Sequence, residues 1–474
     1  MRVVLWRMGA RLAKTFPVSP DLGLAYLYKA LFETGHDVHH VDALLRPTTA
    51  AELVATHGGR GPWLFGTKLY THQIGEWRRF IREVKSLDPA VRVITGGPHP
   101  ASVGSDIFRD VPETDFGYVG EGETSLPLLA ELIENDRDGK QLEKVAGLVY
   151  RENGNVRANP SAVVQDVDAL DAPPWDKLPV REYLRYRAPI RDAAMMPLTT
   201  TRGCPYHCSY CAGFRVSARK MRYRNIGLIC DEIEHLHRTY GVESVSVQDE
   251  NFSTRRQHVI DFSEALIRRN LPVRWDCLAT GIRLDTLKVE DFELMERAGL
   301  HAISVAIESP DQEVLKDMIK GTYIDDQTRR IREIKNRTRI IVNGYFILGY
   351  PAQTAKSVRL TQAYSRRSEL DYALFFLFTP LPGTEIAQRL EDQGRLSPDA
   401  WETFQYDVPS LPLSDLSLRA LKWAQLWAYA GFYLRPRRIR TLIRAILGPT
   451  QVLDMLRRIR AMVFWRRGIP SVAG

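Results

Sequence analysis

Short runs of hydrophobic residues alternate with longer amphipathic segments through the first 135 residues. The strand-like runs lie at 3–6, 38–41, 63–65, 91–95 and 116–119. Between them, helical spacing of apolar residues marks the segments near 24–32, 77–87, 101–108 and 125–133. Asp21 is suited to cap the first of these helices, and Gly35 to end it. The alternation predicts an α/β fold with a doubly wound parallel sheet, whose ligands bind at the carboxyl ends of the strands.

The same alternation returns between residues 196 and 407. Strand-like runs lie at 197–201, 245–248, 273–277, 302–307, 340–348 and 374–379. This predicts a second parallel arrangement, with functional groups again at the carboxyl ends of the strands and in the loops that follow.

Residues 136–190 interrupt the alternation. The runs at 146–151 and 156–159 flank Asn153-Gly154, a pair typical of a tight hairpin turn. A proline-rich stretch at 171–179, with Trp175 in it, follows. We therefore expect a first domain at 1–135, a hairpin and linker at 136–190, a second domain at 191–410 and a C-terminal region at 411–474.

The C-terminal region differs in composition from the rest. Residues 418–434 have a helical pattern rich in Trp and Tyr, and ten arginines follow among apolar residues, at Arg435, Arg437, Arg438, Arg440, Arg444, Arg457, Arg458, Arg460, Arg466 and Arg467. Such a basic helical region suits peripheral contact with an anionic membrane. The alternative is a helical cap with a solvated basic face. We expect no specific nucleic-acid partner, because basic charge alone gives only nonspecific attraction.

Composition agrees with an enzyme of several domains. The chain has 474 residues, of which 44% are hydrophobic and 26% charged, and a net charge of +8. Its start carries no signal-peptide pattern, and no apolar stretch reaches the roughly 18 residues of a spanning helix. We expect a cytoplasmic protein.

Three of the five cysteines lie close together, at Cys204, Cys208 and Cys211. A C-x3-C-x2-C triplet cannot complete a four-ligand structural zinc site by itself. It suits an iron–sulfur cluster in which one iron is open to a small molecule. The alternative is a zinc or redox site that Cys230 or Cys277 completes.

The triplet, with Arg202-Gly203 before it and Tyr210 before the third cysteine, resembles the radical S-adenosylmethionine (SAM) superfamily. The resemblance implies a partial (β/α)6 barrel and a 4Fe-4S cluster on Cys204, Cys208 and Cys211. The open iron of that cluster would bind SAM. Reduction by an external donor, such as a flavodoxin or ferredoxin, would then release a 5′-deoxyadenosyl radical.

Further motifs of the second domain match the same superfamily. Asp249 and Glu250 follow the second strand, where carboxylates would meet the methionyl ammonium of SAM. Glu308-Ser309 resembles the pair that contacts ribose, and Gly349 belongs to the motif near adenine. The alternative for Asp249 and Glu250 is to cap the helix that follows.

Loops of the first domain resemble the cobalamin-binding domain that precedes many radical SAM cores. The candidate residues follow its third, fourth and fifth strands: Gly66, Thr67, Gly96, Gly97, His99, Gly120, Glu121 and Gly122. Glycine lets the backbone approach a bulky flat macrocycle, although Gly-Gly pairs also end strands in many such folds. The first domain would then be a flavodoxin-like sheet of the cobalamin-binding type.

One histidine motif does not fit a cobalt ligand. His39 lies in Asp37-Val-His-His-Val-Asp42, where Asp42 replaces the glycine of the cobalt-binding signature and a strand replaces the expected loop. The loop at 8–15 has no histidine either. We expect cobalamin to bind without a protein histidine below cobalt, with His72 and His99 the histidines near enough to alter this.

Together the resemblances imply a cobalamin-dependent radical SAM enzyme of the class B methyltransferase type. It would transfer a methyl group to an unactivated carbon of a small molecule or a lipid. One alternative is the same architecture performing cyclisation, ring contraction, oxidation or carbon–sulfur bond formation. Another is a non-catalytic sensor of cobalamin or of the iron–sulfur cluster.

Overall fold

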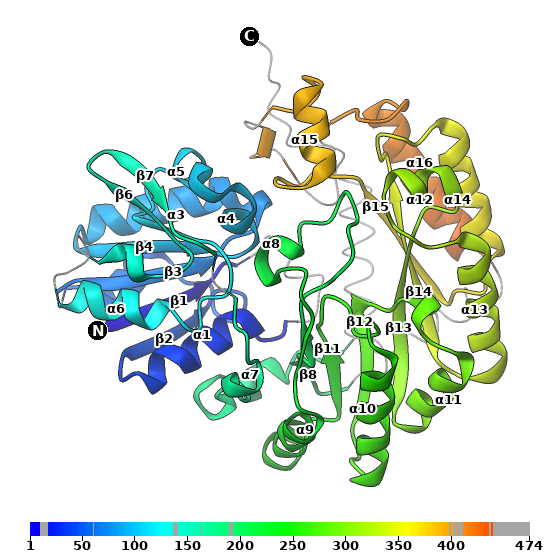
Figure 1. Ribbon diagram of the computed structural model, residues 1–474, viewed down its shortest axis with the longest axis horizontal. Helices are drawn as coiled ribbons and strands as arrows, with labels where there is room; N and C mark the ends of the chain where they lie inside the picture. Colours follow the sequence, from blue (N-terminus) through cyan, green and yellow to red (C-terminus); the bar gives the residue numbers. More distant parts are fainter. Residues whose placement is uncertain are drawn as a thin grey trace.

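The computed structural model contains two α/β units side by side, the first from blue to cyan and the second from green to yellow in Figure 1. It describes residues 1–9, 18–59, 61–135, 141–161, 163–188, 193–397, 400–401, 404, 411–435 and 438. Arg437 and the arginines that follow Arg438 therefore lie outside the described residues. Most of the loop at 8–15 lies outside them as well.

The first unit is a seven-stranded sheet in the order β2-β1-β3-β4-β5-β6-β7. Its first five strands are parallel: β1 (Arg2–Arg7), β2 (Asp37–Asp42), β3 (Trp63–Lys68), β4 (Val91–Gly96) and β5 (Phe116–Tyr118). The helices are α1 (Leu22–Glu33), α2 (Ala50–His57), α3 (Ile74–Leu87), α4 (Pro98–Val103), α5 (Ile107–Asp110) and α6 (Leu126–Glu134). All five predicted strands are confirmed, whereas α2 was not expected.

Alternate side chains of each strand face opposite layers of helices, as a doubly wound sheet requires. Val3 and Leu5 of β1 pack in a core with α1 and α6. Val4 and Trp6, one position along, pack in a core with α2, α3 and α5. The predicted fold class is therefore confirmed for this unit.

The predicted hairpin forms β6 (Leu148–Glu152) and β7 (Asn155–Ala158), with Asn153 and Gly154 at positive φ in its turn. β6 pairs antiparallel with β5, so the hairpin extends the first sheet. The linker follows with α7 (Val180–Tyr183), and its Trp175 is buried and donates a hydrogen bond to Glu232 at 3.0 Å.

The second unit is a six-stranded sheet in the order β15-β14-β13-β12-β11-β8, and all neighbouring pairs are parallel. The strands are β8 (Met195–Leu198), β11 (Ser244–Val247), β12 (Arg274–Gly281), β13 (Leu300–Glu308), β14 (Ile341–Leu348) and β15 (Tyr372–Leu377). The six predicted strands are confirmed. β8 and β15 form the edges, so this arrangement is a partial barrel.

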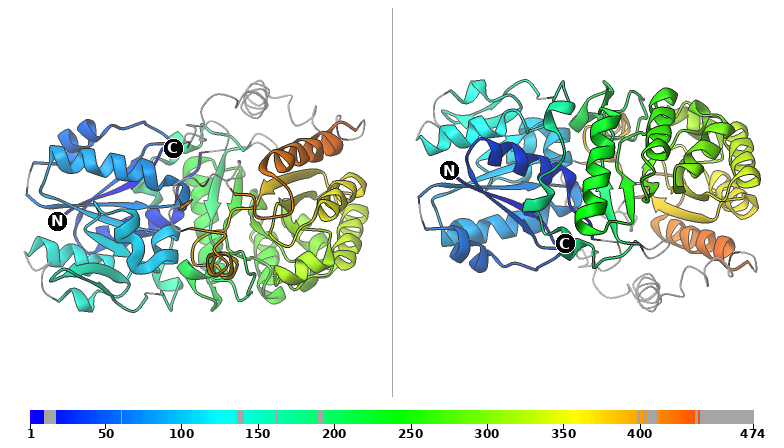
Figure 2. Two further views of the ribbon diagram at one scale, coloured as in Figure 1. Left: turned by 90° about the horizontal axis from the view of Figure 1, so that it is seen from above. Right: turned by 90° about the horizontal axis from the view of Figure 1, so that it is seen from below.

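Helices cover the outer face of the second sheet, as the two end-on views in Figure 2 show. They are α9 (Ile226–Tyr240), α10 (Arg256–Arg268), α11 (Val289–Arg297), α12 (Gln312–Asp317), α13 (Ile324–Arg337), α14 (Ala355–Arg367) and α16 (Leu418–Tyr433). Helix α15 (Glu385–Asp392) lies apart from them, at the top of Figure 1 between the two units. Between β8 and β11 lie a two-stranded ribbon, β9 (Thr201–Arg202) with β10 (Arg222–Tyr223), and the short helix α8 (Phe214–Ser217).

Helix α16 lies along the edge strand β15. The Tyr433 and Tyr429 hydroxyls accept hydrogen bonds from the backbone N–H groups of Ala373 and Phe375, and Gln425 donates to the Phe375 carbonyl. An unpaired strand edge is a site of unwanted association. α16 therefore acts as a helical cap on the barrel.

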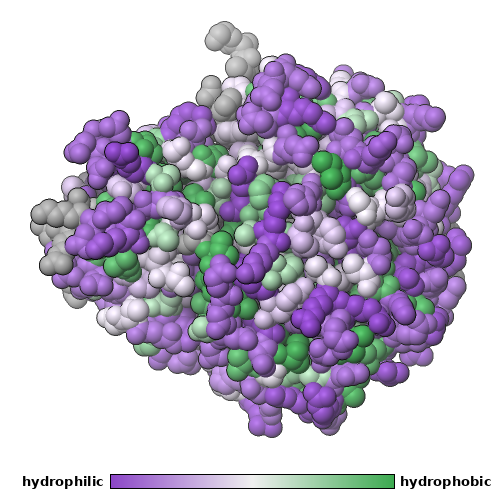
Figure 3. Space-filling model, viewed as in Figure 1, coloured by the Kyte–Doolittle hydropathy of each residue, from purple (hydrophilic) through white to green (hydrophobic). Residues whose placement is uncertain are grey.

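Hydrophilic side chains cover most of the face of the molecule in Figure 3, and hydrophobic ones form only small groups. Among the described residues, no helix combines the length and the apolar character needed to cross a membrane.

Candidate functional site

The two units face each other across a cavity of about 430 Å³, which we call the interdomain cavity. Its wall in the first unit comes from the start of α1 and from the loops at the carboxyl ends of β1, β3, β4 and β5. Its wall in the second unit consists of Thr199, Thr201, Arg202, Val216, Ser217, Gln248 and Glu250. Both sets of strand ends point at one space, as expected for ligand sites in such folds.

Seven of the eight predicted cobalamin residues line this cavity: Gly66, Thr67, Gly96, Gly97, Gly120, Glu121 and Gly122. Gly97 has a φ of 93°, and a β carbon there would come within 2.7 Å of Lys68 Cγ. The close approach of two loops therefore requires glycine at this position. The same bare backbone forms the wall of the cavity.

The eighth residue, His99, is not brought to the cavity. Its ring is fully buried in α4 and bonds Thr71 Oγ1 and Asp110 Oδ2, each at 3.1 Å. His39 lies in β2, as expected, beside Asp37 at 2.9 Å. Within the described part of the chain, no histidine is among the residues that line the cavity.

Lys68 and Asp21 form an ion pair of 3.1 Å in the cavity wall. Asp21 also caps α1, because its side chain accepts a hydrogen bond from the Leu24 N–H. Burial alone would raise the pKa of Asp21, but the charges of Lys68 and Arg7 lower it to about 2. The carboxylate is therefore ionised, and it fixes the Lys68 ammonium at the end of β3.

The three predicted cluster ligands lie on the cysteine loop, residues 203–221, which joins β9 to β10. Cys204 and Cys208 are half-buried and Cys211 is exposed, and all three are free thiols. Gly203 opens the loop with a φ of 93°, and a β carbon there would come within 2.3 Å of the Lys220 carbonyl oxygen. The two-stranded ribbon and this glycine set the path of the loop.

The donor set fits an iron–sulfur cluster. Burial and the neighbouring thiols raise the pKa of the half-buried Cys204, so three thiolates together need a cationic centre to stabilise them. Over the residues that the structure describes, no three His, Cys, Asp or Glu side chains converge on the position of a single metal ion. A 4Fe-4S cluster binds each thiolate to a different iron, so its ligands need not converge.

Cys230 and Cys277 are not placed to complete a zinc or redox site with the cysteine triplet. Cys230 lies in α9 and Cys277 in β12, and both are fully buried in the hydrophobic core of the second unit. Neither joins the cysteine loop.

Tyr210 and Glu308, two of the predicted residues, are in contact. The Tyr210 hydroxyl donates a hydrogen bond of 2.8 Å to Glu308 Oε1, and Lys320 Nζ donates to the same oxygen at 3.0 Å. Glu308 ends β13 with a φ of 61°, a strained conformation for a residue with a side chain. Lys320 is not predicted from the sequence, because nothing in its local pattern marks it.

Asp249 and Glu250 have different surroundings. Asp249 is buried and accepts hydrogen bonds from the Thr200 N–H at 2.7 Å and from the Thr200 and Thr201 hydroxyls. Burial raises its pKa to about 6, although these bonds oppose the shift. Glu250 lines the interdomain cavity and accepts hydrogen bonds from the Gly203 N–H and the Ser217 hydroxyl.

The alternative prediction, that Asp249 and Glu250 cap the helix that follows, is wrong. Helix α10 begins at Arg256 with Arg255 as its N-cap residue, and no side chain caps it. Both carboxylates instead bond the segment that leads into the cysteine loop.

Ser309 and Gly349 lie at the ends of β13 and β14. Ser309 is fully buried, and its hydroxyl accepts a hydrogen bond from the Asp311 N–H at 3.2 Å. Gly349 has a φ of 87°, and a β carbon there would come within 2.9 Å of Leu421 in α16. This glycine therefore has a packing role in the fold.

Comparison with known proteins supports both halves of the site. Residues 9–130 match the B12 binding domain, and residues 198–362 match the radical SAM superfamily. The first range contains the seven predicted cavity residues, and the second contains the three cysteines, Asp249, Glu250, Glu308 and Gly349.

Relatives cover most of the chain. An uncharacterized methyltransferase of Pyrococcus horikoshii is 27% identical over 88% of this chain and 88% of its own length. The anaerobic magnesium-protoporphyrin IX monomethyl ester cyclase of Cereibacter sphaeroides is 27% identical over 90% of this chain and 68% of its own.

A solved structure has the same fold. The radical SAM methyltransferase TsrM of Kitasatospora setae superposes with a TM-score of 0.68 and 20% identity, over 84% of this chain and 76% of its own. The two domain matches, in the same order as the two units and with the cysteine triplet in place, identify the cofactors as a 4Fe-4S cluster, SAM and cobalamin. The chain belongs to the radical SAM enzymes that carry a B12-binding domain.

Proposed function

We propose that the protein is a methyltransferase that acts on an unactivated carbon of a small molecule. The observation that carries this proposal is the interdomain cavity, which places the predicted cobalamin loops opposite Glu250 and the end of the cysteine loop. The name of the Pyrococcus horikoshii relative and the fold of the Kitasatospora setae enzyme support it.

Each set of predicted site residues would hold a different cofactor. Cys204, Cys208 and Cys211 would hold the iron–sulfur cluster, Glu250 and Glu308 would face SAM, and the loops at 66–68, 96–97 and 120–122 would cradle cobalamin. When bound, the cluster and SAM would supply radical hydrogen abstraction, and cobalamin would supply the methyl transfer. The chain would orient them toward one another across the space between its two units.

The hydrogen bonds of the site serve this orientation. Tyr210, next to Cys211, bonds Glu308 at the end of β13, while Glu250 bonds Gly203, next to Cys204. Both ends of the cysteine triplet are thus tied to strand ends of the barrel. Fixed donors of this kind keep reacting groups in one geometry without reorganisation during the reaction.

The test is product analysis of the anaerobic, fully reconstituted protein with SAM, a reductant and candidate substrates. Methyl transfer predicts both 5′-deoxyadenosine and S-adenosylhomocysteine, and a product heavier by one methyl unit. Release of 5′-deoxyadenosine without S-adenosylhomocysteine would exclude methyl transfer and leave the radical chemistry intact.

A cyclase is the second candidate, because the relative from Cereibacter sphaeroides carries that name. Ring closure, or another radical conversion of the same architecture, would leave no added methyl unit in the product. Product mass therefore separates the two candidates.

We also propose a flavodoxin or ferredoxin as the electron donor, since radical SAM chemistry requires a reductant. A reconstituted system in which neither protein supports SAM cleavage, while a chemical reductant does, would contradict this.

Helix α16 supports a peripheral membrane contact and hence a lipid substrate. Its Tyr429 and Tyr433 face β15, whereas Trp423 and Trp427 are 55% and 67% exposed. Exposed tryptophans near basic residues suit the interface of an anionic bilayer. Flotation with anionic vesicles at physiological salt should carry the protein upward, and a Trp423→Ala/Trp427→Ala variant should remain below. If the wild type, like the variant, does not float with the vesicles, the membrane contact is contradicted.

A further inference from the structure

Four charged side chains meet where the loop after β5 touches the base of the cysteine loop. Glu121 and Glu123 come from the first unit, and Arg202 and Arg222 from the β9–β10 ribbon of the second. We call these four residues the glutamate–arginine network. The sequence motifs relate Glu121 to cobalamin and leave the two arginines without a role of their own.

The network is made of directed contacts. Arg222 donates from both terminal nitrogens to Glu121, at 2.5 and 3.0 Å, and Arg202 pairs with Glu123 at 2.8 Å. The backbone N–H of Val164, in the linker, also donates a hydrogen bond to the Glu121 carboxylate at 2.7 Å. A two-pronged contact between guanidinium and carboxylate fixes angle as well as distance.

Three of the four side chains are buried, and Arg202 is only slightly exposed. Their exposed fractions are 4% for Glu121, 4% for Arg222, 5% for Glu123 and 13% for Arg202. Two positive and two negative charges balance, so each carboxylate is already neutralised by protein. Buried charges of this kind are stable only in the paired arrangement, which therefore favours one placement of the two units.

The two arginines bracket the cysteine triplet. Arg202 and Arg222 are direct partners in the antiparallel register of β9 and β10, and the loop between them carries the three cysteines. Arg222 also donates to the Ser217 carbonyl oxygen at 2.6 Å. The hydroxyl of Ser217 in turn donates to Glu250 in the loop after β11.

The same network borders the interdomain cavity. Glu121, Glu123, Arg202, Ser217 and Glu250 are all among its lining residues. Contacts therefore run without a break from the predicted cobalamin loop, through the base of the cysteine loop, to the acidic loop of the barrel.

We propose that the glutamate–arginine network couples the two cofactor sites, so that cobalamin in the first unit orders the cysteine loop of the second. This inference rests on the proposed function only in taking the interdomain cavity as the cobalamin site. The four residues are positioning residues, because their charges are directed at one another. Glu121 acts on cobalamin through the loop backbone, with its carboxylate engaged by Arg222.

The test is hydrogen–deuterium exchange of the cluster-loaded protein, with and without cobalamin. In the wild type, cobalamin should slow amide exchange across residues 203–221 by about fivefold or more, the usual lower size of coupling between sites. Glu123→Gln should bind cobalamin, since Arg222 still holds the Glu121 carboxylate, but should lose this slowing. Arg202→Gln should likewise bind cobalamin and lose the slowing of exchange, and Arg202→Lys should retain part of that slowing.

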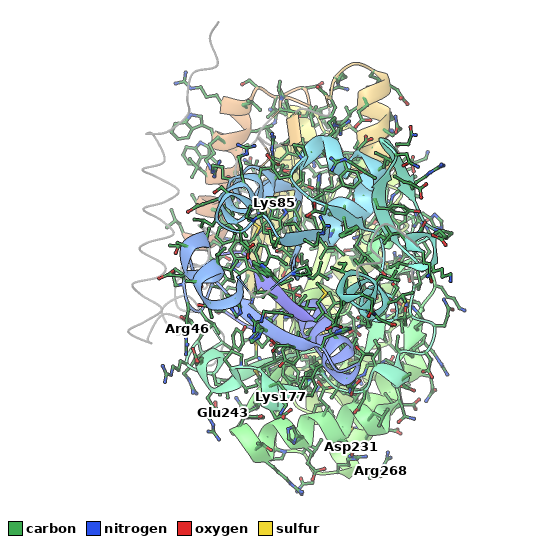
Figure 4. All side chains as sticks on the ribbon, turned by 90° about the vertical axis from the view of Figure 1, so that its left-hand side faces the viewer. Arg46, Lys85, Lys177, Asp231, Glu243 and Arg268 are labelled. Atoms are coloured by element: carbon green, nitrogen blue, oxygen red, sulfur yellow. The ribbon has the colours of Figure 1, made fainter. Side chains whose placement is uncertain are left out.

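Arg46→Gln is the matched control. Arg46 also joins the first unit to the linker through a glutamate, Glu182, but its side chain is 77% exposed. Figure 4 shows Arg46 at the edge of the molecule. This variant should retain the full slowing of exchange in the cysteine loop.

The possible failures are distinct. Glu123→Gln and Arg202→Gln proteins that bind cobalamin and still slow exchange as the wild type does would overturn the coupling and leave the proposed function untouched. A wild type that binds no cobalamin would contradict the proposed function itself. Should the Arg202→Gln protein fail to fold, Glu123→Gln and Arg202→Lys still decide the matter.

Discussion

Cys208 is the middle cysteine of the triplet, and the two cysteines outside the triplet, Cys230 and Cys277, are buried in the core of the second unit. Cys208→Ala should abolish both the visible absorbance of the iron–sulfur cluster and the cleavage of SAM, because two thiolates cannot hold the cluster in place. Iron content and 5′-deoxyadenosine release measure these losses. Cys230→Ala, in the core of α9, is the matched control and should keep both. Full SAM cleavage by Cys208→Ala would refute the assignment of Cys208 as a cluster ligand.

Asp276 in β12 is a buried acid whose charge opposes folding. Its partners are the Ser246 hydroxyl at 2.7 Å and the Leu278 N–H at 3.1 Å, and burial raises its pKa from 3.8 to about 6. Between these pH values the folded protein keeps a proton that the unfolded chain has released. The free energy of unfolding therefore falls as pH rises through this window.

Asp276→Asn should remove that loss, because the amide oxygen can accept both hydrogen bonds without a charge. Relative to wild type, the variant should gain up to about 3 kcal/mol in unfolding free energy between about pH 4 and pH 7. Urea unfolding of the cluster-free protein under reducing conditions measures this difference. An equal difference at both pH values would show that Asp276 is not the titrating group.

At this scale, the sequence predicts residues whose role is encoded in a short motif. The cysteine triplet and Tyr210 are such residues, and so are the glycines of the cavity wall. Lys320 and Arg222 escape prediction because their partners, Glu308 and Glu121, are brought to them only by the fold. His99 follows a recognisable Gly-Gly pair, yet its ring turns into the core toward Asp110.

At the scale of elements, the path of the cysteine loop depends on Gly203. Gly203→Ala would combine a positive φ with a contact of 2.3 Å to the Lys220 carbonyl oxygen. We expect a loss of iron bound per chain, with a destabilisation above the roughly 1 kcal/mol that a left-handed backbone alone costs an alanine.

Gly241→Ala separates the two effects. Gly241 ends α9 at a φ of 73°, but a β carbon there would meet nothing within 4 Å. The free energy of unfolding of this variant, measured by thermal or urea unfolding, should fall only by the cost of the left-handed backbone. The variant should bind iron normally. Equal losses of iron in both variants would mean that the crowding at Gly203 has no role in shaping the loop.

Hydrophobic periodicity predicts the parallel strands of both units, because each strand is buried by helices that are its neighbours in the chain. It does not predict contacts between distant segments. The hairpin of the linker joins β5 of the first sheet, and Tyr429 and Tyr433 of α16 cap β15. Such pairings depend on backbone groups that carry no sequence signal.

At the scale of the whole molecule, two folds of different kinds direct their strand ends into one cavity. The Tyr183 hydroxyl of the linker donates to Asp42 of the first sheet at 2.5 Å, and the glutamate–arginine network ties the same sheet to the cysteine loop. The units are therefore fixed face to face, as a reaction that uses one cofactor from each would require.

The most direct measurement is anaerobic reconstitution followed by ultraviolet–visible spectroscopy with iron and cobalt analysis of the same sample. We expect one 4Fe-4S cluster and one cobalamin per chain, with Cys208→Ala losing the cluster and retaining cobalamin. A chain that fills with cluster but binds no cobalamin would contradict the claim that both centres act across the interdomain cavity.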